Sequence, residues 1–297
     1  MTVLAHAGTS LLSFGTDWLY VLVPLGLYGA GALWMWRRGA TDEGRPIRRP
    51  VARIGSSLED VTGLPGWVAA GLATGLMALV IAVLGFLWDV SWHIDLGRDE
   101  FLFTPAHTAI LVGLAMIAAA GVVAIAFATV EDADVGFRVG PLRVPFSGAA
   151  LAVLGGGSLL GFPIDELWHS AYGIDVTMWG PTHLVMIGGA SLAPIALWLM
   201  VTEAGPGAGR AGYVRRARLL LAGGVLTGLS TFQAEFDFGA PQFQQLYHPV
   251  LVSIAAGIAL VAARSAVGRG GALVAVAVFA AIRSVLAWIV GPVFDLT

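Results

Sequence analysis

Residues 65–93 read PGWVAAGLATGLMALVIAVLGFLWDVSWH, a long apolar run that ends in Asp89, Trp92 and His93. A run of this length can cross the ~30 Å hydrocarbon core of a bilayer as one helix. Asp89 and His93 lie on one face of such a helix, because residues four apart are separated by about one turn. The stretch therefore predicts a membrane helix that carries metal-competent side chains at one end.

The composition extends this prediction to the whole chain. Of 297 residues, 57% are hydrophobic and 12% are charged, with a mean hydropathy of +0.82, whereas soluble domains carry about a quarter charged residues. We expect an all-α bundle of seven or eight helices in a lipid bilayer, with no nucleic-acid partner. The absence of cysteine excludes disulfides and thiolate metal sites. The predicted spans are 17–36, 65–93, 105–129, 144–169, 181–203, 215–234, 246–265 and 271–293.

Arginine predicts the orientation, since all sixteen basic residues are Arg. Fourteen lie in or beside the connections after the first, third, fifth and seventh spans, and only Arg98 lies in an opposite loop. By the positive-inside rule both termini face outward, and we expect the cell membrane as the location. The polar stretch 37–64 divides an N-terminal unit, 1–64, with one span and an Arg-rich cytoplasmic connection, from a seven-helix core, 65–297.

A repeat within the core gathers histidines and carboxylates at the predicted outer face. DVSWHIDLGRDEFLFTPAH (89–107) aligns without gaps to DELWHSAYGIDVTMWGPTH (165–183). Both copies read D-x-x-W-H, then a loop, then P-x-H at the start of the next helix. The shared candidate residues are Asp89, His93, Asp99 and His107 in the first copy, and Asp165, His169, Asp175 and His183 in the second.

A weaker third copy, STFQAEFDFGAPQFQQLYHP, places Glu235 and His248 near ligand positions. The core is thus expected to contain three helical hairpins, at about 65–129, 144–203 and 215–265, which present polar groups at the outer face. Glu235 and His248 are additional metal-ligand candidates. Arg283, inside the last predicted span, needs a carboxylate partner, and we expect either Glu235 or Asp237.

Two imidazoles and one carboxylate per copy form a ligand set that suits copper, zinc or non-haem iron. Each residue also has an ordinary explanation: single histidines are common at membrane interfaces, tryptophans form aromatic belts, and loop carboxylates are often only solvated. The duplication of the whole pattern favours metal binding, because ionisable groups near the hydrocarbon are costly and usually functional.

The first copy resembles the signature of the C subunit of the copper membrane monooxygenases, the particulate methane and ammonia monooxygenases. The matching residues are Asp89, Trp92, His93, Arg98, Asp99, Phe103, Thr104, Pro105 and His107. The resemblance implies that Asp89, His93 and His107 bind copper within the membrane. The family's second element has Asn, a His four residues later and a second His fourteen residues after the first, and it forms a neighbouring copper site.

In this chain Asp165, His169 and His183 match the spacing and order of that second element, with Asp165 in place of Asn. In the first copy the two histidines are one residue farther apart than in the family pattern. The similarity covers about a third of the chain. It implies O₂-dependent oxidation of a small substrate such as an alkane or ammonia, with other monooxygenase subunits or a homo-oligomer as partners.

Under the monooxygenase hypothesis, Asp99 and Asp175 are candidate catalytic residues that would transfer protons or orient the ligands. Two other readings use the same histidines. The first is a membrane protein that binds or handles metal without catalysis. The second is a bis-histidine haem protein, which the repeated Asp disfavours because haem ligation has no need of that carboxylate. Bound copper without substrate turnover would indicate the former, and a Soret band the latter.

The predicted topology can be tested by cysteine labelling, because the chain has no native cysteine. We expect Ser56→Cys, in the Arg-rich connection, to be protected from a membrane-impermeant reagent in intact cells and to react after permeabilisation. Labelling of Ser56→Cys from outside intact cells would contradict the assigned orientation.

Overall fold

The computed structural model describes residues 45–97, 103–172, 177–239 and 244–296, together with isolated positions between 23 and 37. Within these residues seven helices are long and apolar enough to cross a membrane, which confirms the all-α polytopic bundle. The predicted first span, 17–36, falls largely outside the described residues.

The elements follow one another along the chain as α2 (Arg45–Thr62), α3 (Gly66–Leu96), α4 (Pro105–Val130), β1 (Phe137–Val139), β2 (Leu142–Val144), α5 (Phe146–Tyr172), α6 (Pro181–Glu203), α7 (Ala211–Ser230), η2 (Thr231–Gln233), α8 (Ala234–Asp237), η3 (Gln245–Tyr247), α9 (His248–Val267), α10 (Gly271–Trp288) and η4 (Ile289–Val293).

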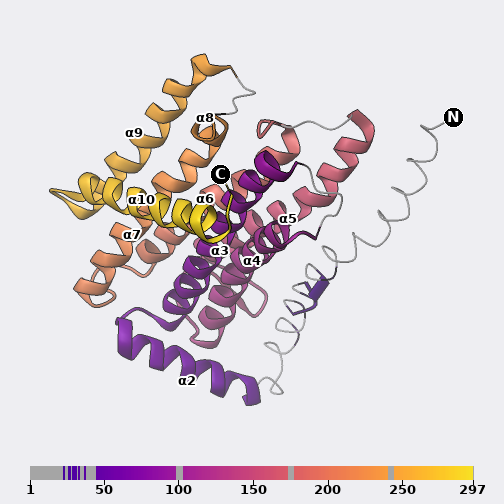
Figure 1. The fold of residues 1–297 in the computed structure, drawn as a ribbon. Helices are drawn as coiled ribbons and strands as arrows, with labels where there is room; N and C mark the ends of the chain where they lie inside the picture. The colour runs from indigo at the N-terminus through magenta and orange to yellow at the C-terminus, as the bar shows by residue number, and fades with distance from the viewer. Residues whose placement is uncertain are drawn as a thin grey trace.

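The spanning helices form two groups that meet along α6 and α7 (Figure 1). In the first group each helix from α3 to α6 packs on the next, and α3 also contacts α6. In the second group α10 returns to pack on both α7 and α9. The chain therefore folds as the helical pairs α3–α4, α5–α6 and α7–α9, followed by α10.

Small residues allow the first pair to approach at backbone distance. A Cβ added at Gly85 of α3 would lie 2.7 Å from the backbone nitrogen of Ile110 on α4. A Cβ added at Gly113 of α4 would lie 2.6 Å from the Cα of Ala82 on α3. These contacts set the distance between the end of α3 and the start of α4, where the first repeat places its polar residues.

The outer helices α9 and α10 present apolar side chains away from the bundle. Only 17% of the apolar window of each is buried within the chain, against 44% for α3. Val261 and Leu273 are 65% and 75% exposed, which suits a surface in contact with lipid. The main core lies instead among α3–α7, around side chains such as Leu114 and Leu197.

The arginine-rich connections gather at one end of the bundle, where α2 lies across the ends of α3 and α4 (Figure 1). The connection before α7 pairs with the end of α2, since Arg210 N donates to Thr62 O at 2.8 Å. Between α4 and α5 the strands β1 and β2 form an antiparallel ribbon. Arg143 of this ribbon donates to Asp132 Oδ1 at 2.8 Å and thereby lowers the pKa of that carboxyl.

Since α3 begins at this arginine-rich end, its last turn and the start of α4 lie at the opposite end. The same holds for the last turn of α5 and the start of α6. The structure therefore separates the arginines of these connections from the repeated Asp and His residues along the bundle axis. Which end faces the cell exterior stays a prediction.

The close α3–α4 contact predicts a stability difference between two glycines. Gly113→Ala should lower the free energy of unfolding by about 1–3 kcal/mol, because the new methyl group meets the α3 backbone. Gly156→Ala is the matched control, since an added Cβ there has no atom within 4 Å. Unfolding in mixed micelles by titration with a denaturing detergent measures both. Equal stability of the two variants would contradict the packing argument.

Candidate metal centres

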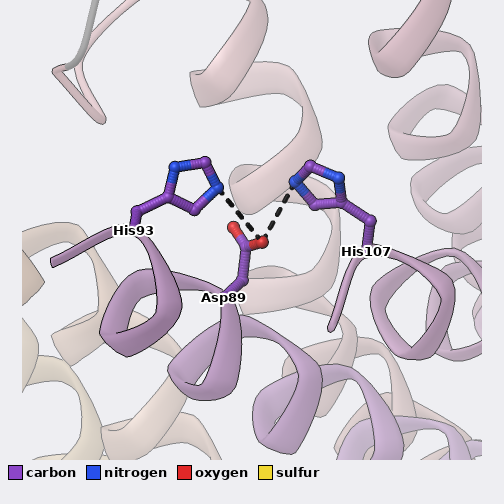
Figure 2. Close-up of side chains that lie close together, drawn as sticks. All are labelled: Asp89, His93 and His107. Atoms are coloured by element: carbon purple, nitrogen blue, oxygen red, sulfur yellow. Dashed lines mark ion pairs between the residues drawn. The ribbon is translucent and has the colours of Figure 1, made fainter. Parts of the chain in front are cut away.

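The first cluster joins the end of α3 to the start of α4 (Figure 2). Asp89 Oδ1 lies 3.5 Å from His93 Nε2 on the same helix and 3.0 Å from His107 Nε2 on the next. One ligand atom from each residue lies within 4.8 Å of the other two. The structure thus brings together the three metal candidates of the first repeat, with the carboxylate between two imidazoles.

The position of His107 follows from the way α4 begins. Pro105 opens the helix, where its missing N–H costs no hydrogen bond. Thr104 is the N-cap residue, and its hydroxyl accepts a hydrogen bond from His107 N at 3.2 Å. On its other side, the His107 ring packs edge-on against Phe162 of α5, with 6.5 Å between ring centroids. The backbone of His107 is therefore held by the helix cap, and its ring contacts the neighbouring helix.

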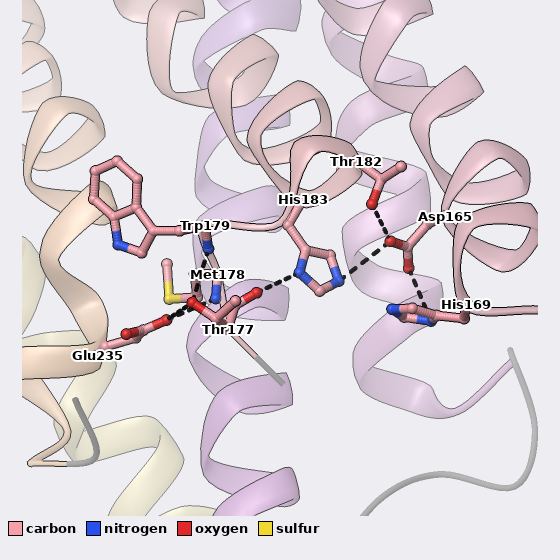
Figure 3. A network of polar contacts seen from close by, with 8 residues as sticks. All are labelled: Asp165, His169, Thr177, Met178, Trp179, Thr182, His183 and Glu235. Atoms are coloured by element: carbon pink, nitrogen blue, oxygen red, sulfur yellow. Dashed lines mark hydrogen bonds and ion pairs between the residues drawn. The ribbon is translucent and has the colours of Figure 1, made fainter. Parts of the chain in front are cut away.

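The second cluster repeats this arrangement between α5 and α6 (Figure 3). Asp165 Oδ2 lies 3.7 Å from His169 Nδ1, and Asp165 Oδ1 lies 3.4 Å from His183 Nε2. Again one ligand atom from each residue lies within 4.8 Å of the others. The second copy adds one contact, because the Thr182 hydroxyl donates a short hydrogen bond to Asp165 Oδ1. This donor supports the carboxylate at the position where the family pattern has Asn.

The orientation of the His183 ring is set by the turn that precedes α6. His183 Nδ1 lies 2.7 Å from the carbonyl oxygen of Thr177 (Figure 3). A carbonyl oxygen can only accept, so Nδ1 carries the proton and donates it. In the neutral ring Nε2 then holds a lone pair, which points toward Asp165. A hydrogen bond of this kind commonly fixes the tautomer of a metal-binding histidine.

The polar atoms of the clusters fit a bound cation. Asp89 Oδ1 is buried and makes no hydrogen bond of ordinary geometry within the described part of the chain, although two imidazole nitrogens lie close by. In the second cluster the His183 lone pair faces a carboxylate oxygen, which is unfavourable unless a proton or a metal ion lies between them. Nitrogen and oxygen ligands bind zinc at about 2.0–2.2 Å. Atoms grouped within 4.8 Å of one another need only small shifts to reach such an ion.

The same geometry bears on the haem alternative. A bis-histidine haem has one imidazole on each face of the macrocycle, which occupies the space between them. In the first cluster the Asp89 carboxylate lies within 3.5 Å of both imidazoles and fills that space. The arrangement thus favours a metal ion bound directly by protein side chains.

Within its described residues the third hairpin does not reproduce the cluster. Asp237 pairs with Arg283 at 3.1 Å, so Asp237 is the carboxylate partner expected for this arginine. His248 stacks on Phe236, with 4.6 Å between ring centroids, and belongs to neither Asp–His–His group. Glu235 also lies outside both groups and contacts the turn before α6 instead.

The two candidate catalytic carboxylates, Asp99 and Asp175, lie outside the described residues, so their roles stay predictions. The structure adds residues that the repeat did not single out: Thr177 orients His183, Thr182 supports Asp165, and Phe162 packs on His107. Thr182 lies within the P-x-H motif, so its proximity to the cluster could have been inferred. The Thr177 contact is made through its backbone carbonyl, which no residue pattern reveals.

Comparison with protein-family models, curated proteins and solved structures finds no match to this chain. The ligand assignment therefore depends on the geometry of the two clusters and on the sequence motifs.

The two clusters predict separate metal occupancies. His93→Ala should remove about one equivalent of metal per chain and leave the second cluster occupied, because its three ligands come from α5 and α6. His169→Ala should remove the other equivalent. Elemental analysis of protein purified in native-like lipid measures both, with the double variant as the reference for background metal. Unchanged stoichiometry in both single variants would refute the assignment.

Proposed function

We propose that this chain is a copper-binding membrane protein, similar in function to the C subunit of the copper membrane monooxygenases, that contributes to O₂-dependent oxidation of a small substrate such as an alkane or ammonia. The observation that supports the proposal is the pair of Asp–His–His clusters, each held where one membrane helix ends and the next begins. The first cluster uses the Asp and both histidines of the motif that resembles the family.

Copper is the metal that the donor set and the resemblance together favour. Imidazole nitrogen suits copper, zinc and iron, and divalent copper binds such ligands most tightly of the first-row divalent ions. Zinc and non-haem iron remain alternatives on ligand chemistry alone. Bound copper would supply the one-electron redox chemistry that activation of O₂ requires.

The chain's own residues would hold and orient the metal. Asp89 and Asp165 each contribute one carboxylate between two imidazoles and so partly balance the charge of a cation near the hydrocarbon. In the second cluster the Thr177 carbonyl orients the His183 ring, and the Thr182 hydroxyl orients the Asp165 carboxylate. Asp99 and Asp175, in the loops that follow each first histidine, are the candidates for proton transfer.

We place the clusters near the external face of the cell membrane, on the strength of the arginine distribution. A small apolar substrate would then reach them from the bilayer or from the interface. Because the family's enzymes combine three different subunits, we expect this chain to act with further subunits or as a homo-oligomer.

A second candidate function is metal binding or transfer without catalysis. The observation that favours it is the exposure of the clusters: the His93 side chain is 30% exposed and that of His183 is 21% exposed. A metal bound there lies within reach of an exchange partner, which a handling protein requires.

The proposal is tested on protein purified in lipid nanodiscs. We expect about two copper ions per chain, a Cu(II) electron paramagnetic resonance signal with nitrogen couplings, and oxidised product from an alkane or ammonia that depends on O₂ and a reductant. His93→Ala should reduce product formation by at least ~10-fold, since loss of a residue that merely supports a ligand already costs about 10–100-fold. Copper without turnover, even with added partner subunits, would select the handling function, and the absence of bound copper would refute the proposal.

A further inference from the structure

Glu235 of α8 is a buried carboxylate, 7% exposed. It belongs to the third hairpin but contacts the turn between the two helices of the second hairpin. Its Oε1 accepts hydrogen bonds from the Thr177 hydroxyl and from Met178 N, both at 2.7 Å (Figure 3). Burial of a charged group is costly unless hydrogen bonds compensate it. The structure meets this cost by directing the carboxylate at the turn 177–180, which leads into α6.

The turn 177–180 connects Glu235 to the second metal cluster. The Thr177 carbonyl accepts the Nδ1–H of His183 at 2.7 Å, while Trp179 N donates to the Thr177 hydroxyl at 3.2 Å. Thr177 therefore donates to Glu235 through its hydroxyl and accepts from His183 through its backbone carbonyl. Any shift of this turn moves the carbonyl that orients the His183 ring.

The first hairpin shows why the second needs this support. At the start of α4 the N-cap is Thr104, whose hydroxyl accepts from the His107 backbone. The aligned N-cap of α6 is Gly180, which has no side chain and makes no side-chain cap. The second copy thus lacks the local anchor of the first, and Glu235 supplies an anchor from a different helical pair.

We propose that Glu235 is a positioning residue of the second metal centre. By holding the turn 177–180 it keeps the Thr177 carbonyl on His183 Nδ1, so that Nε2 carries the lone pair that binds metal. This inference rests on the proposed metal-binding function. In it the third hairpin supplies no metal ligand and instead supports the second centre.

The two centres then differ in their dependence on α8. By holding Thr177, Glu235 should keep the His183 ring in the orientation and tautomer that bind a cation. The first cluster draws its three ligands from α3 and α4, which carry none of these contacts. A change at Glu235 should therefore weaken one centre selectively.

The experiment compares Glu235→Ala and Glu235→Gln, each combined with either His93→Ala or His169→Ala so that one centre is measured at a time. The control is Asp237→Asn, which removes a carboxylate two residues away that pairs with Arg283. With Cu(II) as the probe, Glu235→Ala should weaken the second centre by ~10–100-fold and leave the first unchanged. Glu235→Gln keeps an acceptor oxygen and should lose less Cu(II) affinity at the second centre. Asp237→Asn should leave the affinities of both centres as in the parent.

A second readout needs no metal. The ¹⁵N chemical shifts of the His183 ring, assigned by comparison with His183→Gln protein, report which nitrogen carries the proton. In metal-free parent protein we expect protonated Nδ1, and in Glu235→Ala a mixture of tautomers. An unchanged tautomer together with unchanged affinity overturns the inference, as does equal weakening of both centres. If the parent binds no copper, the proposed function fails, while the tautomer still decides the role of Glu235.

Discussion

Each candidate metal centre depends on two helices that approach closely enough for the last turn of one to meet the first turn of the next. Between α3 and α4 this approach is made by Gly85 and Gly113, whose missing side chains let the two backbones touch. In a bilayer, where lipid is as apolar as leucine, such close packing is a principal source of helix association. The same contact that holds the bundle together therefore sets the distance between a carboxylate and the imidazole across the hairpin.

This dependence explains why the cluster can be built from few residues. A pair four apart, such as Asp89 and His93, is organised by the helix alone, and only the second histidine relies on tertiary structure. Proline in the first turn fixes where the helix that carries this second histidine begins. The pattern is compact enough to be repeated as a unit. The second copy keeps the Asp and both His residues, but it has no side-chain cap at Gly180, and the turn before α6 contacts Glu235 of another hairpin.

The sequence alone predicted two features that depend on local periodicity, the helical spans and the grouping of Asp and His residues. Apolar length predicted the seven spans from 65 onward, with ends that differ by a few residues: the segment predicted at 65–93 is helical from Gly66 to Leu96. The gap-free repeat placed Asp and both histidines of each copy together, because helix geometry and a hairpin suffice for that. The contact between Glu235 and Thr177 was beyond such reasoning. This contact joins residues 58 positions apart, and alignment of the third hairpin with the first two gives no sign of it.

The ion pair between Asp237 and Arg283 has a consequence for how the protein is made. The acid precedes the base by 46 residues, so the carboxylate is synthesised with α7 and α8 before α10. An isolated arginine is expensive to insert into the hydrocarbon. If Asp237 is in place first, α10 enters the bilayer with a partner for Arg283. The order of the two residues along the chain therefore favours insertion of α10 after α7 and α8.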